Sequence, residues 1–165
     1  MSHRIKKQWW LFRIKYDGTK VIFLTHYKFY TAKDALNEYQ KTYLEMMKAL
    51  LPIQRPDGFW NASLHDPDNF GGKETTGTAL FVYGLAWGVN KGLLSKKKYT
   101  LAIAKGWNAL ATEAVHPDGY LGYVQGTGKQ PSEGQPVAYD SKPDFEDYGL
   151  GCFLLAGSEV VKLCK

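Results

Sequence analysis

The sequence carries one pattern twice, and this repeat constrains the fold more than any other feature. Residues 56–60 read Pro-Asp-Gly-Phe-Trp, and after a Gly-rich loop the Glu-Thr-Thr-Gly of residues 74–77 opens an apolar run. Residues 117–120 read Pro-Asp-Gly-Tyr, and after a longer polar loop the Glu-Asp-Tyr-Gly of residues 146–149 opens a second apolar run. A turn, a long loop and a Glu-x-x-Gly helix start, repeated after about 60 residues, predict stacked helical hairpins with their loops on one face.

Four helices are expected, and they alternate in character. Residues 34–51 and 96–113 have apolar side chains at three- and four-residue spacing on one side, which is typical of helices that face water on the other side. Residues 74–88 and 146–163 are apolar nearly all round, and such helices are buried on nearly all sides. We expect Pro52 to end the first helix and Ser95 to cap the third. The fold class is therefore mainly α, with inner and outer helices.

The first 30 residues differ from the rest of the chain. Residues 8–16 and 20–30 are rich in aromatic and β-branched residues, and Asp17-Gly18 between them is a hairpin turn signal. We predict a basic, aromatic β-hairpin segment over 1–30 and a helical domain over 31–165. A basic aromatic segment can bind nucleic acid, but we favour a solvated basic strand pair.

Composition excludes several classes of protein. A chain of 165 residues is one domain by the usual expectation, and its apolar fraction of 44% is that of a globular protein. Cys152 and Cys164 lie on one expected helix, roughly 18 Å apart, which is too far for a disulfide. No metal-ligand spacing, membrane-length apolar run or secretory leader is evident. We expect no metal, no cofactor and no membrane contact, and a cytoplasmic location.

Several consecutive motifs resemble a known family. The segments 54–60, 74–81, 83–88, 116–125 and 149–160 are similar, in order and spacing, to the C-terminal part of glycoside hydrolase family 105. These enzymes are the unsaturated rhamnogalacturonyl hydrolases, related to the unsaturated glucuronyl hydrolases of family 88. The resemblance runs from about residue 33 to the end of the chain, and residues 1–30 do not share it.

The resemblance implies an (α/α)6 toroid of six inner and six outer helices, of which this chain holds about two hairpins. Residues 74–88 and 146–163 are then inner helices, and the substrate cleft lies over the loops that enter them. The implied substrate is an oligosaccharide ending in an unsaturated uronic acid, released during the degradation of pectin and other polysaccharides. The implied activity is hydrolysis without a cofactor.

The chain departs from the family in what it lacks. The family's catalytic aspartate and its Trp-Ala-Arg-Gly-Asn-Gly-Trp motif do not occur in this sequence. We therefore expect a C-terminal fragment that is inactive alone, missing an N-terminal half or associating with itself to cover open helix flanks. One alternative is a non-catalytic remnant that binds carbohydrate or a partner. A second is a basic hairpin that binds nucleic acid.

The family's chemistry requires a protonated carboxylic acid beside the unsaturated ring. The candidates here are Asp66 and Glu74. Asp66 follows His65 in a loop, where an Asp-Pro turn explains it equally well. Glu74, like Glu146 and Asp147, lies at a helix N-terminus, which favours the ionised form and the role of a structural cap.

Other residues are candidates for binding sugar. Trp60 and Tyr123 can stack on a sugar ring, although a place in the core is the simpler explanation of each aromatic. Thr75 and Thr76 can donate to hydroxyl groups or shape the helix start. The full set of substrate-binding candidates is Trp60, His65, Thr75, Thr76, Tyr123, Gln125 and Asp147. We expect His116 to be a turn residue.

Overall fold

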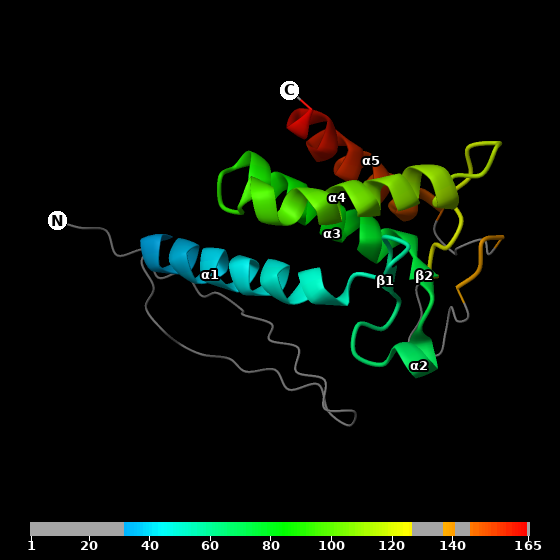
Figure 1. Ribbon diagram of the computed structural model, residues 1–165, viewed down its shortest axis with the longest axis horizontal. Coiled ribbons are helices and arrows are strands. Elements are labelled where there is room, and N and C mark those ends of the chain that lie inside the picture. Colours follow the sequence, from blue (N-terminus) through cyan, green and yellow to red (C-terminus); the bar gives the residue numbers. More distant parts are fainter. Residues whose placement is uncertain (1–31, 127–136, 141–145, 165) are drawn as a thin grey trace. The chain divides into compact units, whose positions relative to one another are not determined.

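The computed structural model describes residues 32–126, 137–140 and 146–164 (Figure 1). The chain divides into two compact units, residues 1–41 and 42–165, and the first helix crosses from one to the other. The expected hairpin over 8–30 and the domain boundary at residue 30 lie outside the described residues, so both stay predictions. The second unit is described below.

Helices dominate the described residues, as expected for the mainly α class. In chain order the elements are α1 (Ala32–Leu50), a 3-10 turn η1 (Leu51–Ile53), β1 (Trp60–Asn61), α2 (Pro67–Phe70), β2 (Lys73–Glu74), α3 (Thr75–Asn90), α4 (Lys96–Ala109), a π-helical turn η2 (Leu110–Ala114) and α5 (Glu146–Leu163). The starts of α4 and α5 agree with the prediction. The strands β1 and β2, which pair antiparallel, were not predicted.

Pro52 does not simply stop the first helix. The α-helix ends at Leu50, and the chain continues through η1 with the proline in its first turn. Proline is tolerated there because the first turn of a helix needs no donor from it. Ser95 does occupy the N-cap position of α4, but its side chain makes no capping hydrogen bond, so that part of the prediction is wrong.

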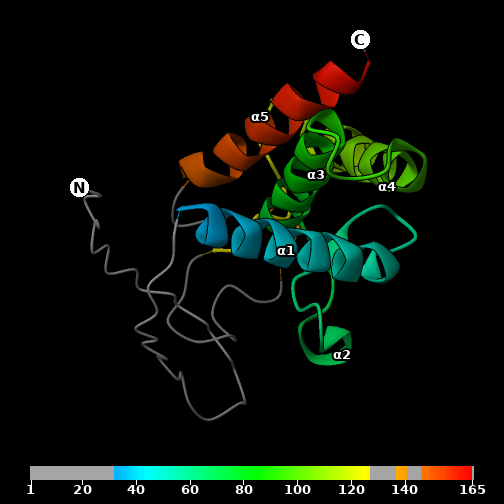
Figure 2. The same cartoon turned by 90° about the vertical axis from the view of Figure 1, so that its left-hand side faces the viewer.

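The helix α3 lies between α4 and α5 (Figure 2). Its residues Ala79, Val82, Leu85 and Ala86 are completely buried, as expected for a helix that is apolar nearly all round. Leu80 is the exception, with 46% of its surface exposed. The helix α3 therefore has the burial expected of an inner helix, except at Leu80.

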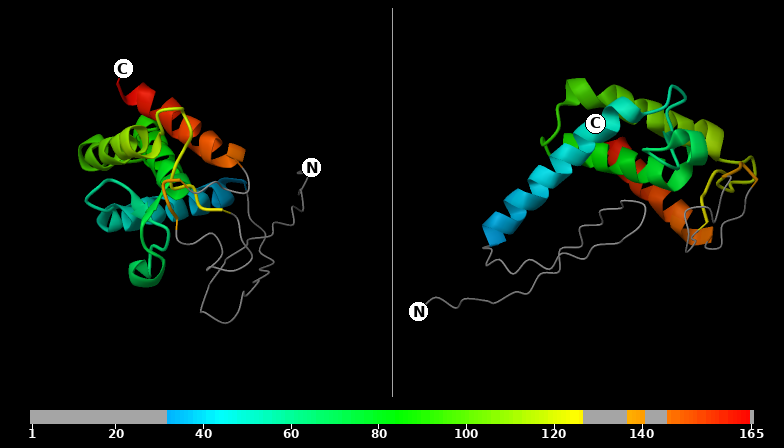
Figure 3. Two further views of the ribbon diagram at one scale, coloured as in Figure 1. Left: turned by 90° about the vertical axis from the view of Figure 1, so that its right-hand side faces the viewer. Right: turned by 90° about the horizontal axis from the view of Figure 1, so that it is seen from below.

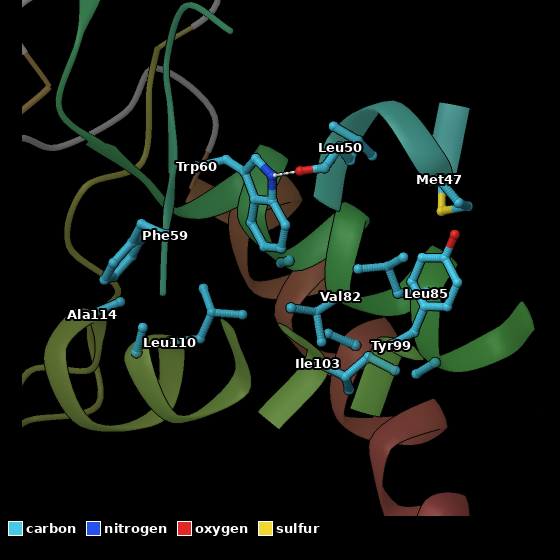
Figure 4. Close-up of a cluster of buried hydrophobic side chains, with 14 of the residues drawn as sticks. Met47, Leu50, Phe59, Trp60, Val82, Leu85, Tyr99, Ile103, Leu110 and Ala114 are labelled. Carbon is cyan, nitrogen blue, oxygen red and sulfur yellow. Dashed lines mark hydrogen bonds between the residues drawn. The ribbon is translucent and has the colours of Figure 1, made fainter. Parts of the chain in front are cut away.

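The core extends from α3 to the end of α1, the strand β1 and the buried side of α4. Figure 4 shows this cluster, whose labelled members are Met47, Leu50, Phe59, Trp60, Val82, Leu85, Tyr99, Ile103, Leu110 and Ala114. Two glycines allow the close packing. A Cβ atom at Gly88 would lie 1.9 Å from the hydroxyl oxygen of Tyr43, and one at Gly106 would lie 2.5 Å from a methyl carbon of Val82. A side chain at either position would therefore require a neighbouring side chain to move.

The two Pro-Asp-Gly turns have the same local structure, which confirms the repeat at atomic detail. Asp57 accepts a hydrogen bond from the backbone N–H of Phe59 at 3.2 Å, and Asp118 accepts one from Tyr120 at 3.1 Å. The glycine between each pair has a positive φ, 95° at Gly58 and 87° at Gly119. Glycine adopts this backbone conformation without steric penalty. The two copies therefore share the hydrogen bonding and the backbone conformation of the turn as well as its sequence.

The polar connections lie at one end of the helices. The N-terminal ends of α3 and α5 and the C-terminal end of η2 meet the strand pair and residues 115–125 there (Figure 3). Backbone contacts hold them together: the N–H of Thr75 donates to the carbonyl of Tyr123 at 2.8 Å. The hydroxyl of Tyr148 on α5 donates to the carbonyl of Gln125. The described parts of both loops thus share one face, as the repeat predicted.

The helix α5 is apolar on a side that the described residues do not cover. Ala156 is completely buried, and Glu159 is buried where it accepts a hydrogen bond from Asn90. Large apolar side chains lie exposed elsewhere on the helix: Leu150 at 48%, Leu154 at 61%, Leu155 at 46% and Val161 at 58%. An exposed surface of this kind marks a place of association in many proteins.

Candidate functional site

The strand pair fixes the start of α3. Trp60 pairs with Glu74, and Asn61 pairs with Lys73. The backbone N–H of Trp60 also donates to the hydroxyl oxygen of Thr78 at 3.0 Å, one turn into the helix. The first turn of α3 is therefore held by β1 on one side and by residues 122–125 on the other.

Glu74 is the N-cap of α3. Its carboxylate accepts hydrogen bonds from the backbone N–H of Thr76 at 2.8 Å and from that of Gly77. The hydroxyl of Thr76 and the more distant N–H of Gln125, at 3.4 Å, also point at one of its oxygens. Only 6% of the residue is exposed. The arrangement satisfies the free amides of a helix start, which is the structural role that the sequence favoured for Glu74.

The two threonines after Glu74 have different environments. Thr75 is completely buried, and its hydroxyl donates to the carbonyl of Gly122 at 2.6 Å. Thr76 is half-buried, and its hydroxyl donates to Glu74. Thr75 therefore has no exposed hydroxyl to offer a sugar, whereas Thr76 lies at the edge of the accessible surface.

Tyr123 and Gln125 border the same helix start. Both are half-buried. Tyr123 has a φ of 56°, a left-handed conformation that bulky residues rarely adopt. Its ring lies edge-on to that of Phe59, with 5.9 Å between centroids, and 5.5 Å from that of Tyr139. These two residues remain candidates for binding because neither is fully buried.

Trp60 is a core residue in this structure. It is 1% exposed, and its indole N–H donates to the carbonyl of Leu50 at 2.9 Å (Figure 4). Its ring meets that of Phe81 edge-on. A ring without an exposed face cannot stack on a sugar, so the expected stacking role is corrected to a packing role.

Two of the remaining candidates, His65 and Asp66, lie at the short helix α2 and not at the start of α3. Asp66 caps the short helix α2, accepting from the backbone and the side-chain amide of Asn69 at 3.3 and 2.7 Å. His65 lies exposed beside it. Asp147 is in the first turn of α5, and its side chain lies outside what the structure describes. His116 is a turn residue, as expected, because its carbonyl accepts from Gly119 N–H at 2.9 Å.

A lysine that the sequence did not single out lies beside this region. The ammonium group of Lys73 forms an ion pair with Glu113 on η2 and lies 5.3 Å from the centroid of the Tyr123 ring. The hydrogen bond to Glu113 raises the pKa of Lys73, and burial opposes this in part. No sequence pattern links positions 73 and 113, so only the fold reveals the pair.

Asp57 lies near the same lysine and is tied to Arg55. Arg55 donates to the carboxylate of Asp57 at 2.8–3.1 Å and to the side-chain oxygen of Asn61 at 2.7 Å. Burial raises the pKa of Asp57, but hydrogen bonds from Arg55 and the Phe59 N–H, with the charges of Arg55 and Lys73, outweigh it and lower that pKa. Asp57 is therefore a charged, structural member of its turn.

The described residues contain neither a candidate metal site nor a membrane-spanning helix. Over 32–126, 137–140 and 146–164, no three His, Cys, Asp or Glu side chains gather closely enough to bind a metal ion. Within the same ranges, no helix is both long enough and apolar enough to cross a membrane.

Comparison with known proteins decides the family. The family described as Glycosyl Hydrolase Family 88 matches residues 28–164, which is most of the chain. The chain belongs to glycosyl hydrolase family 88. Membership of family 88 agrees with the resemblance to families 105 and 88. The mainly helical fold of the present chain is the one expected of part of a toroid.

Two relatives are similar to this chain over most of its length. It is 41% identical over 125 residues to a Formosa agariphila protein named "Unsaturated 3S-rhamnoglycuronyl hydrolase", covering 76% of this chain but 31% of the relative. It is also 41% identical to a solved family 88 structure from Bacteroides vulgatus, with a TM-score of 0.71, covering 81% of this chain and 38% of that one. The chain thus spans about a third of the length of the relatives it matches.

A more distant likeness concerns the fold alone. A possible family 105 member from Salmonella enterica is 20% identical, with a TM-score of 0.65 over 82% of this chain. The same helical arrangement therefore persists where little sequence identity remains.

Proposed function

We propose that this family 88 chain forms part of the substrate-binding wall of an unsaturated glycuronyl hydrolase and does not catalyse the reaction by itself. Its substrate class is an oligosaccharide that ends in an unsaturated uronic acid, released from pectin or another acidic polysaccharide. The support is the family membership together with the name of the Formosa agariphila relative.

The observation that carries this proposal is the hydrogen bonding of the Glu74 carboxylate. A general acid for this reaction must hold a proton on a carboxyl oxygen and present it to the double bond of the substrate. Both oxygens of Glu74 instead face the backbone donors of Thr76 and Gly77. The Glu74 carboxylate therefore serves the helix, and we expect the chemistry to require an acid from elsewhere.

Binding is supported by the groups around that helix start. The half-buried Thr76, Tyr123 and Gln125 offer a hydroxyl, a phenol ring and an amide at one end of α3. Sites for small polar molecules combine apolar surface with a few such groups. This mixture fits a sugar better than it fits an apolar ligand.

Catalysis by the isolated chain is tested with an unsaturated uronic-acid disaccharide. The ultraviolet absorbance of its enol ether disappears when the sugar is hydrolysed. We expect no loss above buffer at high concentrations of this chain, while the full-length Formosa agariphila relative serves as a positive control for the substrate. A loss of absorbance in proportion to the concentration of this chain contradicts the proposal.

Binding is tested by calorimetric titration of the full chain with the same disaccharide. We expect Gln125→Ala to weaken binding by about threefold to tenfold, since a lost hydrogen bond contributes about 1 kcal/mol. Asn108→Ala removes an exposed amide from α4 and serves as the matched control, with the affinity of the unmodified chain expected. Equal affinity in both variants excludes Gln125 from the binding wall.

Self-association is a further part of the proposal, and it rests on α5. Leu150, Leu154 and Val161 lie within about 40° of one another around the helix and are all 48–61% exposed. We expect the apparent mass in sedimentation experiments to rise with protein concentration. Leu154→Glu is expected to abolish this rise because a charge cannot be buried there at low cost. A concentration-independent monomer contradicts self-association.

Two other expectations stay predictions. Binding of nucleic acid depends on residues 8–30, which lie outside the described residues. A cytoplasmic location rests on the cysteine content, which is a feature of the sequence alone.

A further inference from the structure

The side chains of Lys73, Glu113, Phe59 and Tyr123 form a second cluster, here called the Lys73 cluster. The ammonium group of Lys73 forms an ion pair with the carboxylate of Glu113 and lies 5.4 Å from the ring centroid of Phe59 and 5.3 Å from that of Tyr123. The side chains of Lys73 and Glu113 are 25% and 41% exposed. The cluster is therefore open to a ligand.

This cluster is distinct from the capped start of α3. Lys73 and Glu74 are neighbours in the short strand β2. Successive side chains of a strand point to opposite faces, so Lys73 points away from the side on which Glu74 caps the helix. A ligand at the Lys73 cluster would lie beside the start of α3, with Tyr123 between the two.

Two members of this cluster, Glu113 and Tyr123, lie in unusual backbone conformations. Glu113 belongs to η2, and π-helical turns occur frequently at functional sites. Tyr123 has a positive φ, as no other residue except glycine does in the described parts of the chain. Backbone strain of this kind gathers at binding sites. The two features arise in different segments, so their coincidence supports a role beyond packing.

The charges of the region favour a neutral ligand. Lys73 interacts with two carboxylates, those of Glu113 and Asp57, and Asp57 in turn binds Arg55. The two positive and two negative charges cancel, so the region offers no net charge to attract an anion. It does offer a donor and an acceptor side by side. Neighbouring hydroxyl groups of a sugar can accept from an ammonium group and donate to a carboxylate at the same time.

The aromatic ring completes the match to a sugar. Tyr123 is half-buried, and its ring lies next to the ion pair, 5.3 Å from the ammonium group of Lys73. The hydrogen bond that Lys73 donates to Glu113 raises the pKa of Lys73, so the ammonium group remains a donor at neutral pH. A partly exposed ion pair contributes little to stability by itself. Stability alone therefore does not account for the arrangement.

We propose that Lys73, Glu113 and Tyr123 form an accessory subsite for a neutral pyranose ring of the oligosaccharide, beside the start of α3. The ammonium group donates to one hydroxyl, the carboxylate accepts from the next, and the Tyr123 ring packs against the C–H groups of the sugar. The choice of a sugar rests on the proposed function, whereas the location rests on the cluster itself.

The test is a nuclear magnetic resonance titration of the full, isotope-labelled chain with methyl rhamnopyranoside, a neutral probe. We expect the backbone amides of Lys73, Glu113 and Tyr123 to shift in a saturable way at millimolar sugar. Lys73→Met and Tyr123→Asn are each expected to weaken the apparent affinity about tenfold. Asparagine tolerates the left-handed conformation at position 123, so this variant removes the ring and keeps the backbone.

A matched control exists in α4. The ammonium group of Lys98 lies 5.4 Å from the ring centroid of Tyr99, a similar lysine–tyrosine contact with no carboxylate partner assigned to it in the described residues. Lys98→Met is expected to bind the neutral sugar as the unmodified chain does. Glu113→Gln provides a second route if Lys73→Met does not fold, and it is expected to weaken binding to a similar extent.

The outcomes separate this subsite from the proposed function. Unchanged affinity in Tyr123→Asn and Glu113→Gln, or shifts at the cluster with sodium glucuronate but none with the neutral sugar, overturns the subsite. If the unsaturated disaccharide shifts Thr76 and Gln125 while the neutral sugar leaves Lys73 unmoved, the subsite fails and the proposed function stands. If neither sugar shifts any residue at this end of α3, both fail.

Discussion

Replacing Trp60 by alanine is expected to lower the free energy of unfolding by about 3–5 kcal/mol. The side chain is 1% exposed, and its indole N–H donates to the carbonyl of Leu50 at 2.9 Å. The substitution leaves a large cavity between β1, α1 and α3 and removes the partner of a buried carbonyl. Urea denaturation measures the effect as a lower midpoint.

A tryptophan in α4 is the matched control for this experiment. Trp107 is half-buried and stacks on Phe153, with 5.0 Å between ring centroids. Trp107→Ala removes the same atoms from a less enclosed site, so we expect a clearly smaller loss of stability. A loss at Trp60 no larger than that at Trp107 contradicts the central position of Trp60.

A conservative variant separates packing from sugar binding at the same position. Trp60→Phe keeps an aromatic ring in the core and loses the hydrogen bond to Leu50, so we expect it to fold with reduced stability. Its affinity for the unsaturated disaccharide is expected to equal that of the unmodified chain, because the ring at position 60 has no exposed face. Weaker binding in the folded variant restores the stacking hypothesis.

The helices were predictable because their signals are local. Apolar periodicity predicted α1 and α4, apolar runs predicted α3 and α5, and the Glu-x-x-Gly pattern marked the starts of α3 and α5 to within one residue. The Pro-Asp-Gly turns were predictable for the same reason, since Gly58 and Gly119 take conformations that other residues avoid. Each of these features depends on residues within one or two turns of chain.

The site was less predictable because its contacts join distant residues. Lys73 and Glu113 are separated by 40 positions, and the two-residue strands β1 and β2 are too short for an alternating pattern. Trp60 shows a second difficulty. A buried tryptophan and one that stacks on a sugar have the same composition and the same neighbours in sequence, so only burial distinguishes them.

The glutamate of the Glu-x-x-Gly pattern shows that a motif can suggest a catalytic role for a residue that caps a helix. An acidic residue in a glycoside hydrolase cleft invites a catalytic role, but the position of Glu74 at the N-cap already assigns it to the helix. Glutamate is not among the preferred N-cap residues. Its side chain nevertheless reaches the N–H groups of Thr76 and Gly77 and also approaches that of Gln125.

Replacing Glu74 by alanine is expected to lower the free energy of unfolding by about 2–3 kcal/mol. The substitution leaves the amides of Thr76 and Gly77 without their acceptor in a region where Glu74 itself is only 6% exposed. Hydrogen bonds to a charged group contribute about 1.5–3 kcal/mol, and a buried donor without a partner adds a desolvation penalty. Urea denaturation followed by tryptophan fluorescence measures the loss.

Aspartate at position 74 distinguishes the cap from a chemical role. Aspartate is among the best N-cap residues, so Glu74→Asp is expected to recover most of the stability that Glu74→Ala loses. A group that must reach a substrate would not tolerate a side chain one methylene shorter in the same way. If Glu74→Asp is as unstable as Glu74→Ala, the contact to Gln125 matters more than the cap. If both variants are as stable as the unmodified chain and only sugar binding falls, Glu74 belongs to the binding site and not to the helix.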